Sequence, residues 1–200
     1  MYRNIKAKLF SEREINDLLK AWIAISFAFA VVFNGFSFRF EFIYYFLISS
    51  LTVGVGFLLH ELAHRTVARH YGCFAEFKSF DSMLILAVAM SFFGFVFAAP
   101  GAVMIHGPVG KTRNGIISAA GPGVNLVLAL LFLIISIILK PTGILLQITS
   151  YGFLVNSWLA LFNLIPFGNF DGRKIMVWNK LVFFVMISIS LVFMLFQGKI

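Results

Sequence analysis

The sequence predicts an all-α polytopic membrane protein with about six transmembrane helices and a re-entrant or short β segment between the second and third helices of its core. Of the 200 residues, 60% are apolar and only 12% are charged, about half the charged fraction of a soluble domain. Long stretches lack any charged side chain, and each has about the 18 residues needed to cross a hydrocarbon core ~30 Å thick. These stretches are 21–38, 42–60, 82–110, 114–139, 141–170 and 181–198.

Residues 1–20 are polar and charged, and we interpret them as a short amphipathic segment at the cytoplasmic interface. A first span is expected over 21–38 and a second over about 42–70. The second span should end at Tyr71-Gly72, since glycine is common just after a helix end. Further spans are expected, in chain order, over 114–139, over 141–165 and from 181 to about 196.

An insertion over about 82–110 separates the second span from the later ones. It follows a short polar stretch of mixed charge at 73–81. Its last part is short, partly β-branched and bracketed by Pro and Gly, which predicts a strand at Ala102 to Ile105. Irregular or extended backbone at membrane depth is tolerated only against protein or a water-filled cavity. We therefore expect the insertion to be re-entrant rather than a full crossing.

The net charge of +8 would favour a nucleic-acid partner in a soluble protein. In a chain with these spans it is an orientation signal instead, because short basic loops stay on the cytoplasmic side. We therefore expect the lipid bilayer as the surroundings and no nucleic-acid partner. Cys73 is the single cysteine, which excludes an intramolecular disulfide and a cysteine-cluster metal site.

The segment His60-Glu61-Leu-Ala-His64 lies at the end of the second apolar span. On a helix, His60 and His64 fall on one face about one turn apart, so both imidazoles can reach one metal ion. Glu61 projects about 100° around the helix from His60, which leaves its carboxylate free to act on a water at the metal. Zinc suits this ligand set and keeps an open fourth position for that water. The pattern fixes only three positions, so a chance match is the alternative.

Two histidines leave zinc short of a protein ligand, and the third must come from elsewhere. His70 completes the spacing of soluble metzincins, but that pattern needs a glycine where this sequence has Val67. On an unbroken helix His70 lies about 15 Å along the axis from His60, which is out of reach. Glu76 is expected in an interfacial loop. Asp171, which follows a helix end broken by proline, is the remaining serious candidate.

Asp171 can reach the histidine pair only if both lie at the same depth in the membrane. A cytoplasmic amino terminus and a re-entrant 82–110 segment bring Asp171 to the inner side, beside the end of the second span. That topology leaves only three of the 16 Lys and Arg residues outside, namely Arg39, Lys140 and Lys199. A full crossing at 82–99 would put five more of them outside, against the positive-inside rule.

Three motifs now occur together, in the order His60-Glu61-Leu-Ala-His64, Gly121-Pro122-Gly-Val-Asn125, and Asn163-Leu-Ile-Pro166 followed after four residues by Asp171-Gly172. This arrangement resembles the site-2 protease family of intramembrane zinc metalloproteases, in a prokaryotic six-helix form without a PDZ or nucleotide-sensing domain. The resemblance covers a catalytic core at about 42–172 within one membrane-embedded protease domain over 1–200.

The resemblance implies one zinc ion per chain, bound by His60, His64 and Asp171. It implies that Glu61 is the general base, that Asn163 binds substrate or stabilises the oxyanion, and that Asn125 orders the site. The reaction would be hydrolysis of a peptide bond in or near a transmembrane segment of a protein substrate by zinc-activated water. The expected location is the cell membrane, as a multi-pass protein with the site toward the cytoplasm.

A protease that cuts transmembrane helices needs its substrate extended, and an edge strand can hold such a segment by β-addition. Val103, Met104 and Ile105 are therefore candidate substrate-binding residues, although the strand could equally pack against the helices alone. Arg65 departs from the expected pattern, because its charge directly after His64 must be hydrated or paired. A metal-binding membrane transporter and a non-catalytic membrane scaffold are the alternative functions, and the oligomeric state is left open.

Overall fold

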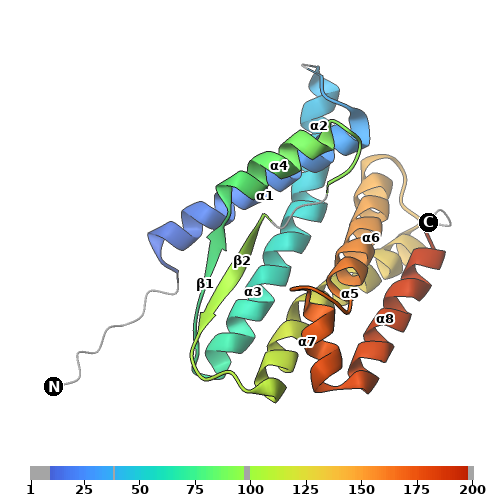
Figure 1. The fold of residues 1–200 in the computed structure, drawn as a ribbon. Coiled ribbons are helices and arrows are strands. Elements are labelled where there is room, and N and C mark those ends of the chain that lie inside the picture. The colour runs from blue at the N-terminus through green and yellow to red at the C-terminus, as the bar shows by residue number, and fades with distance from the viewer. Residues whose placement is uncertain (1–9, 38, 97–99, 198–200) are drawn as a thin grey trace.

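The computed structural model describes residues 10–37, 39–96 and 100–197. Within them the chain is mostly helical, with one small two-stranded sheet. Figure 1 shows a central helix, α3 (Val55–His70), with the sheet on one side and the later helices α5 to α8 on the other. The helix that carries the two histidines is therefore covered on both sides by the rest of the chain.

The first helix, α1 (Glu12–Asn34), begins well before the predicted start at residue 21. The side-chain oxygen of Ser11 accepts a hydrogen bond from the backbone N–H of Glu14 at 3.0 Å, as an N-terminal cap does. The sequence Ser-x-x-Glu is a capping-box pattern, so the helix start was readable in the sequence. The prediction of an amphipathic segment separate from the first span was therefore wrong for residues 12–20, which belong to the same helix.

The second span was predicted over about 42–70 and is confirmed as one helix over Phe40–His70. It consists of α2 (Phe40–Ser49), a π-helical turn over Ser50–Gly54, and α3. The widened turn makes room for the indole N–H of Trp22, which donates to the Ser50 carbonyl at 3.1 Å. At the other end Gly72 adopts a positive φ of 77° and stops the helix.

The strand predicted at 102–105 is confirmed as β2 (Gly101–His106). It pairs antiparallel with β1 (Phe74–Ser79), and the short helix α4 (Asp81–Ser91) connects the two. Interpreting 73–81 as a polar linking stretch missed β1. The burial along β1 alternates, with Ala75, Phe77 and Ser79 buried, but the exposed Phe74 and the buried polar Ser79 concealed this period of two in the sequence.

Four further helices complete the fold: α5 (Lys111–Leu139), α6 (Gly143–Asn163), α7 (Asp171–Trp178) and α8 (Lys180–Leu195). Among the described residues, four helices are long and apolar enough to cross a membrane: Glu12–Asn34, Phe40–His70, Lys111–Leu139 and Gly143–Asn163. The helices α4 and α8 are apolar but shorter. The helix α7 was not predicted.

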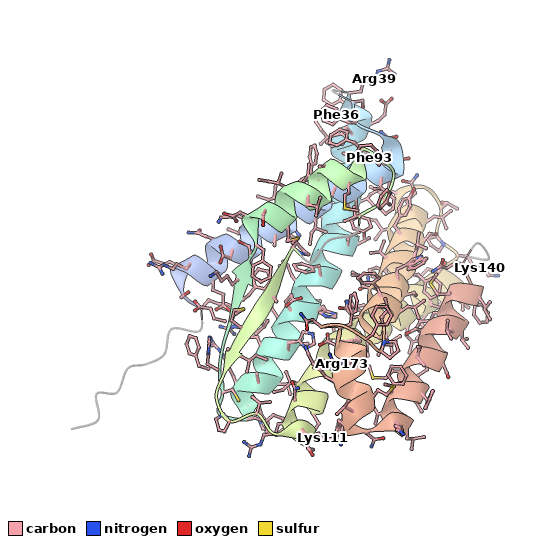
Figure 2. All side chains as sticks on the ribbon, viewed as in Figure 1. Phe36, Arg39, Phe93, Lys111, Lys140 and Arg173 are labelled. Carbon is pink, nitrogen blue, oxygen red and sulfur yellow. The ribbon has the colours of Figure 1, made fainter. Side chains whose placement is uncertain are left out.

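The outward faces of these helices are apolar. Ile138 at the end of α5 is 72% exposed, and Leu181 and Leu195 of α8 are 74% and 75% exposed. Large apolar surfaces of this kind mark contact with lipid or protein, and together with the four long helices they indicate a membrane protein. Figure 2 shows Arg39 at one end of the protein and Lys111 at the other, with Lys140 at the side between them.

The two largest apolar clusters hold the helices together. One joins the four helices α5, α6, α7 and α8, and its members include Phe153, Leu164 and Ile175. The other joins α1, α3, α6 and the sheet, with Phe57 of α3 packed edge-on against Phe77 of β1 at a ring distance of 6.0 Å. The site described next lies on the face of α3 that meets α5 and α7.

Candidate metal centre

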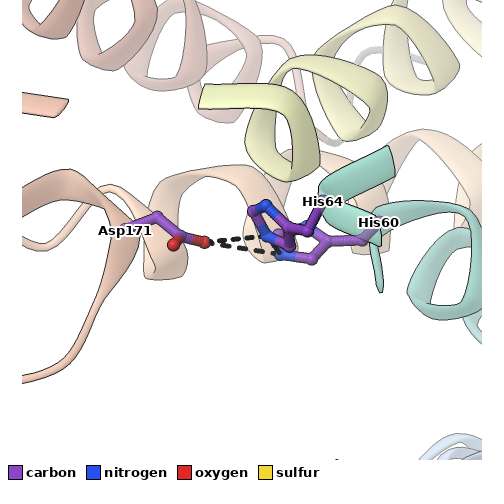
Figure 3. Close-up of side chains that lie close together, drawn as sticks. All are labelled: His60, His64 and Asp171. Atoms are coloured by element: carbon purple, nitrogen blue, oxygen red, sulfur yellow. Dashed lines mark hydrogen bonds and ion pairs between the residues drawn. The ribbon is translucent and has the colours of Figure 1, made fainter. Parts of the chain in front are cut away.

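His60, His64 and Asp171 come together in the interior of the protein. The Nε2 atoms of the two imidazoles are 3.0 Å apart, and Asp171 Oδ2 lies 3.1 Å from His64 Nε2 and 3.7 Å from His60 Nε2. Figure 3 shows the carboxylate pointing at the edge of both rings. All three residues are buried, and their ligand atoms form a group that could hold a metal ion.

The spacing of these three atoms fits zinc. Two ligands about 2.0–2.1 Å from a tetrahedral zinc ion are roughly 3.3 Å from each other. The three measured separations, 3.0, 3.1 and 3.7 Å, lie on either side of that value. Two imidazole nitrogens and one carboxylate oxygen are also the donor set of many catalytic zinc sites, which keep a fourth position open.

Each histidine is oriented by a hydrogen bond from its other ring nitrogen to α5. His60 Nδ1 lies 2.6 Å from Asn125 Oδ1, and His64 Nδ1 lies 2.7 Å from the Ile117 carbonyl. Both acceptors require an N–H at Nδ1, so in each ring the lone pair of Nε2 faces the metal position. Pro122 has no backbone N–H, so the carbonyl that loses its helical donor is that of Ser118, the residue after Ile117.

Asn125 is itself held by a second buried amide. Its Nδ2 donates to Asn156 Oδ1 at 2.9 Å and to the Gly56 carbonyl at 3.2 Å, and Asn156 Nδ2 donates to the Gly152 carbonyl at 2.8 Å. Both amides are fully buried. Sequence reasoning missed Asn156, although a polar residue inside an apolar span is a signal of function or of a buried partner.

Gly121 lies directly against the metal-facing edge of the imidazoles. A Cβ atom at this position would come within 2.6 Å of His60 Nε2 and closer still to His64 Nε2. Only a residue without a side chain leaves these two nitrogens free, which gives a physical reason for glycine in the segment Gly121-Pro122-Gly-Val-Asn125.

Gly121→Ala should therefore push the two imidazoles apart and lower zinc affinity roughly tenfold or more. Zinc affinity can be measured by competition with a chromophoric chelator in detergent. Gly123→Ala is the matched control, because a Cβ at Gly123 meets nothing within 4 Å. Wild-type affinity in the Gly121→Ala protein would show that the metal is held elsewhere.

Asp171 is the first residue of α7, directly after the Pro166 loop, and Lys174 Nζ lies 3.3 Å from its Oδ1. Burial by itself raises the pKa of the Asp171 carboxyl. The facing imidazoles of His64 and His60 outweigh this effect, so the pKa lies well below its ordinary value. The carboxyl is consequently ionised, as a metal ligand must be.

The predicted site residues that are not metal ligands lie around the three ligands, on α3, at the end of α6 and on β2. Glu61 is buried beside the ligands, and its carboxylate lies within hydrogen-bonding range of the Val103 backbone in β2. Asn163 ends α6, and its Nδ2 donates to the Leu159 carbonyl one turn earlier at 2.9 Å. Met104 and Ile105 follow Val103 along β2, and Met104 is 40% exposed. His70 is exposed and lies apart from the histidine pair, as expected.

Fold and site together indicate a membrane protein whose buried His60, His64 and Asp171 could hold a metal ion. The chain belongs to a family of zinc metalloproteases. It is 43% identical over 175 residues, covering 86% of this chain and 88% of the relative, to the protein of Methanocaldococcus jannaschii named "Putative zinc metalloprotease MJ0611". No protein-family model matches the sequence, and no solved structure matches it. The relative's name and the cluster of His60, His64 and Asp171 agree on zinc.

Proposed function

We propose that this chain is an intramembrane zinc metalloprotease of the site-2 type, which hydrolyses a peptide bond in or near a transmembrane segment of a membrane protein. The observation that carries this proposal is the buried group of His60, His64 and Asp171 at the end of an apolar helix, with Glu61 beside it. The helix α8 would be a further crossing, and α4 with β2 would form the re-entrant insertion of a six-helix arrangement.

Within the site, His60, His64 and Asp171 would hold zinc. Zinc, when bound, lowers the pKa of a water and polarises a carbonyl group. Glu61 takes the proton of the attacking water and passes it to the nitrogen of the leaving amine. Asn125 and Asn156 keep His60 in the orientation that presents Nε2, and Asn163 remains the candidate for contact with the substrate carbonyl.

The free edge of β2 supports a substrate-binding role for this strand. In an antiparallel pair, residues alternate between those bonded to the partner strand and those whose backbone groups point away from it. The N–H of Phe77 donates to Glu14 and so points away from β2, and its pairing partner Val103 points away from β1 in the same way. Backbone groups of Gly101, Val103 and Ile105 therefore face away from β1, where an extended substrate segment can add as a third strand.

A metal-binding transporter is the alternative, and the site favours it less. Transport pathways place polar residues along several helices and often lie between structural repeats. Here the three potential ligands converge on one point, and the carboxylate of Glu61 is next to them. The basic residues Lys111, Arg173 and Lys174 all line one cavity. Basic residues gather on the cytoplasmic side of membrane proteins, so this cavity agrees with a site toward the cytoplasm.

Zinc removal tests the proposal. Purified protein in detergent is incubated with a panel of synthetic single-span peptides, and products are identified by mass spectrometry. We expect cleavage within or beside the apolar segment, its loss after treatment with 1,10-phenanthroline, and its return when zinc is added. Cleavage that persists without zinc would contradict the proposal. Intact peptides with fully zinc-loaded protein, combined with zinc uptake into liposomes, would favour the transporter.

A further inference from the structure

Glu14 is a fully buried carboxylate far from the metal centre in sequence. It lies in the first turn of α1, and none of its surface is exposed. A buried charge is tolerated only when it is paired and hydrogen-bonded. Its partner is Arg65, whose Nη2 donates to Glu14 Oε2 at 2.9 Å and whose Nε lies 2.5 Å from Oε1. The guanidinium also lies over the Phe10 ring at 4.1 Å.

Glu14 also holds the edge of the sheet. The backbone N–H of Phe77 donates to Glu14 Oε1 at 3.0 Å. Two residues earlier on the same edge, the Ala75 carbonyl accepts from Arg69 Nε at 2.9 Å. The outer edge of β1 is thus attached to α3 twice, directly through Arg69 and through the Glu14–Arg65 ion pair.

These contacts close a ring that includes the proposed general base. Phe77 is paired with Val103 across the sheet, and the backbone of Val103 lies within hydrogen-bonding range of the Glu61 carboxylate. Glu61 and Arg65 are four residues apart on α3 and so share one helix face. This pair of sheet residues therefore lies between two acidic side chains, Glu14 at the β1 edge and Glu61 at the β2 edge.

We propose that Glu14 is a positioning residue, which acts through Arg65 and the Phe77–Val103 pair to fix the free edge of β2 against Glu61. This inference rests on the proposed role of Glu61 and on β2 as the substrate-binding edge. The ring sets two distances at once: that between Glu61 and the strand, and that between the strand and the metal ligands on α3. It also supplies the paired state that the charge of Arg65, directly after His64, requires.

Hydrogen–deuterium exchange of the zinc-loaded protein tests whether Glu14 holds β2 in place, and it does not depend on enzymatic activity. In Glu14→Gln we expect faster exchange both in 74–79 and in 101–106, with α5 unchanged. Asp17→Asn is the matched control, because Asp17 is on the same helix and contacts β1 only through the side chain of Ser79 at 3.0 Å. Faster exchange confined to 74–79 would overturn the proposal, since β2 would then be held independently of Glu14.

A double variant separates positioning from stability. Glu14→Leu combined with Arg65→Leu replaces the whole ion pair by apolar side chains, which buried pairs often tolerate without loss of stability. We expect normal zinc content and cooperative thermal unfolding, but kcat/KM roughly tenfold lower, with most of the change in KM, because the Phe77 N–H loses its acceptor and the substrate edge is displaced. Wild-type kcat/KM in this protein would overturn the positioning role.

Failure of the proposed protease function and failure of the positioning role of Glu14 give different results. If the wild-type protein cleaves no peptide, the proposed function fails, yet the exchange experiment still shows whether Glu14 controls β2. If the wild-type protein is active and zinc-loaded but the exchange of 101–106 is unchanged in Glu14→Gln, the positioning role alone fails.

Discussion

Glu61→Ala is expected to reduce peptide cleavage at least ~10²-fold while zinc content stays at about one ion per chain, because general acid–base groups typically contribute 10²–10⁴-fold. Glu61 is beside the three potential ligands but is not one of them. Its removal therefore takes away the proton acceptor and leaves the metal centre in place. Cleavage of the peptide panel and elemental analysis of the same preparation give the two values.

Glu41→Ala is the matched control for Glu61→Ala. Glu41 is an exposed acid at the start of the same long helix, and its removal should change neither cleavage nor zinc. Wild-type activity in the Glu61→Ala protein would remove Glu61 from the mechanism. Loss of zinc together with activity would instead make Glu61 part of the metal site.

Asp171→Ala should lose zinc and activity together. The Oδ2 atom of Asp171 is the nearest carboxylate oxygen to His64 Nε2, at 3.1 Å, and its removal leaves two imidazoles as the protein ligands. Fewer ligands mean a much weaker site, and zinc content after dialysis should fall from about one ion per chain to near zero. Elemental analysis of the detergent-purified proteins measures this directly.

Asp81→Ala serves as the comparison for Asp171→Ala, because Asp81 is also the first residue of a helix but is exposed and pairs with Lys20 at 3.4 Å. This variant should keep its zinc. Full zinc occupancy in Asp171→Ala would mean that another side chain completes the site, and the convergence of α3 and α7 would then need a different explanation.

Two of the three potential metal ligands, His60 and His64, could be predicted because their signal is local. His60, Glu61 and His64 share a helix turn, and the spacing of such a turn is fixed. Asp171 was found by a different argument, from the depth that the charge distribution assigned to each span. The strand β2 was recognisable from its β-branched residues between Pro and Gly.

The supporting contacts could not be predicted from spacing, because each joins residues far apart in the chain. Asn156 reaches His60 only through Asn125, and Glu14 meets Arg65 only after α1 has packed against α3. The start of α1 and the strand β1 are different cases, since the sequence contains a capping box at Ser11 and polar residues at alternate positions around Phe77. Their short length and mixed charge obscured both signals.

The metal centre joins the two ends of the catalytic region, with two of its side chains in α3 and the third at the start of α7. During synthesis, His60 and His64 are made before α5 and α6, and Asp171 is made after them. Throughout that interval the nascent chain has only two of its three metal-binding side chains. Under the proposed function, the site cannot hydrolyse a peptide bond until α7 has been synthesised, and helices that are being inserted before then are spared.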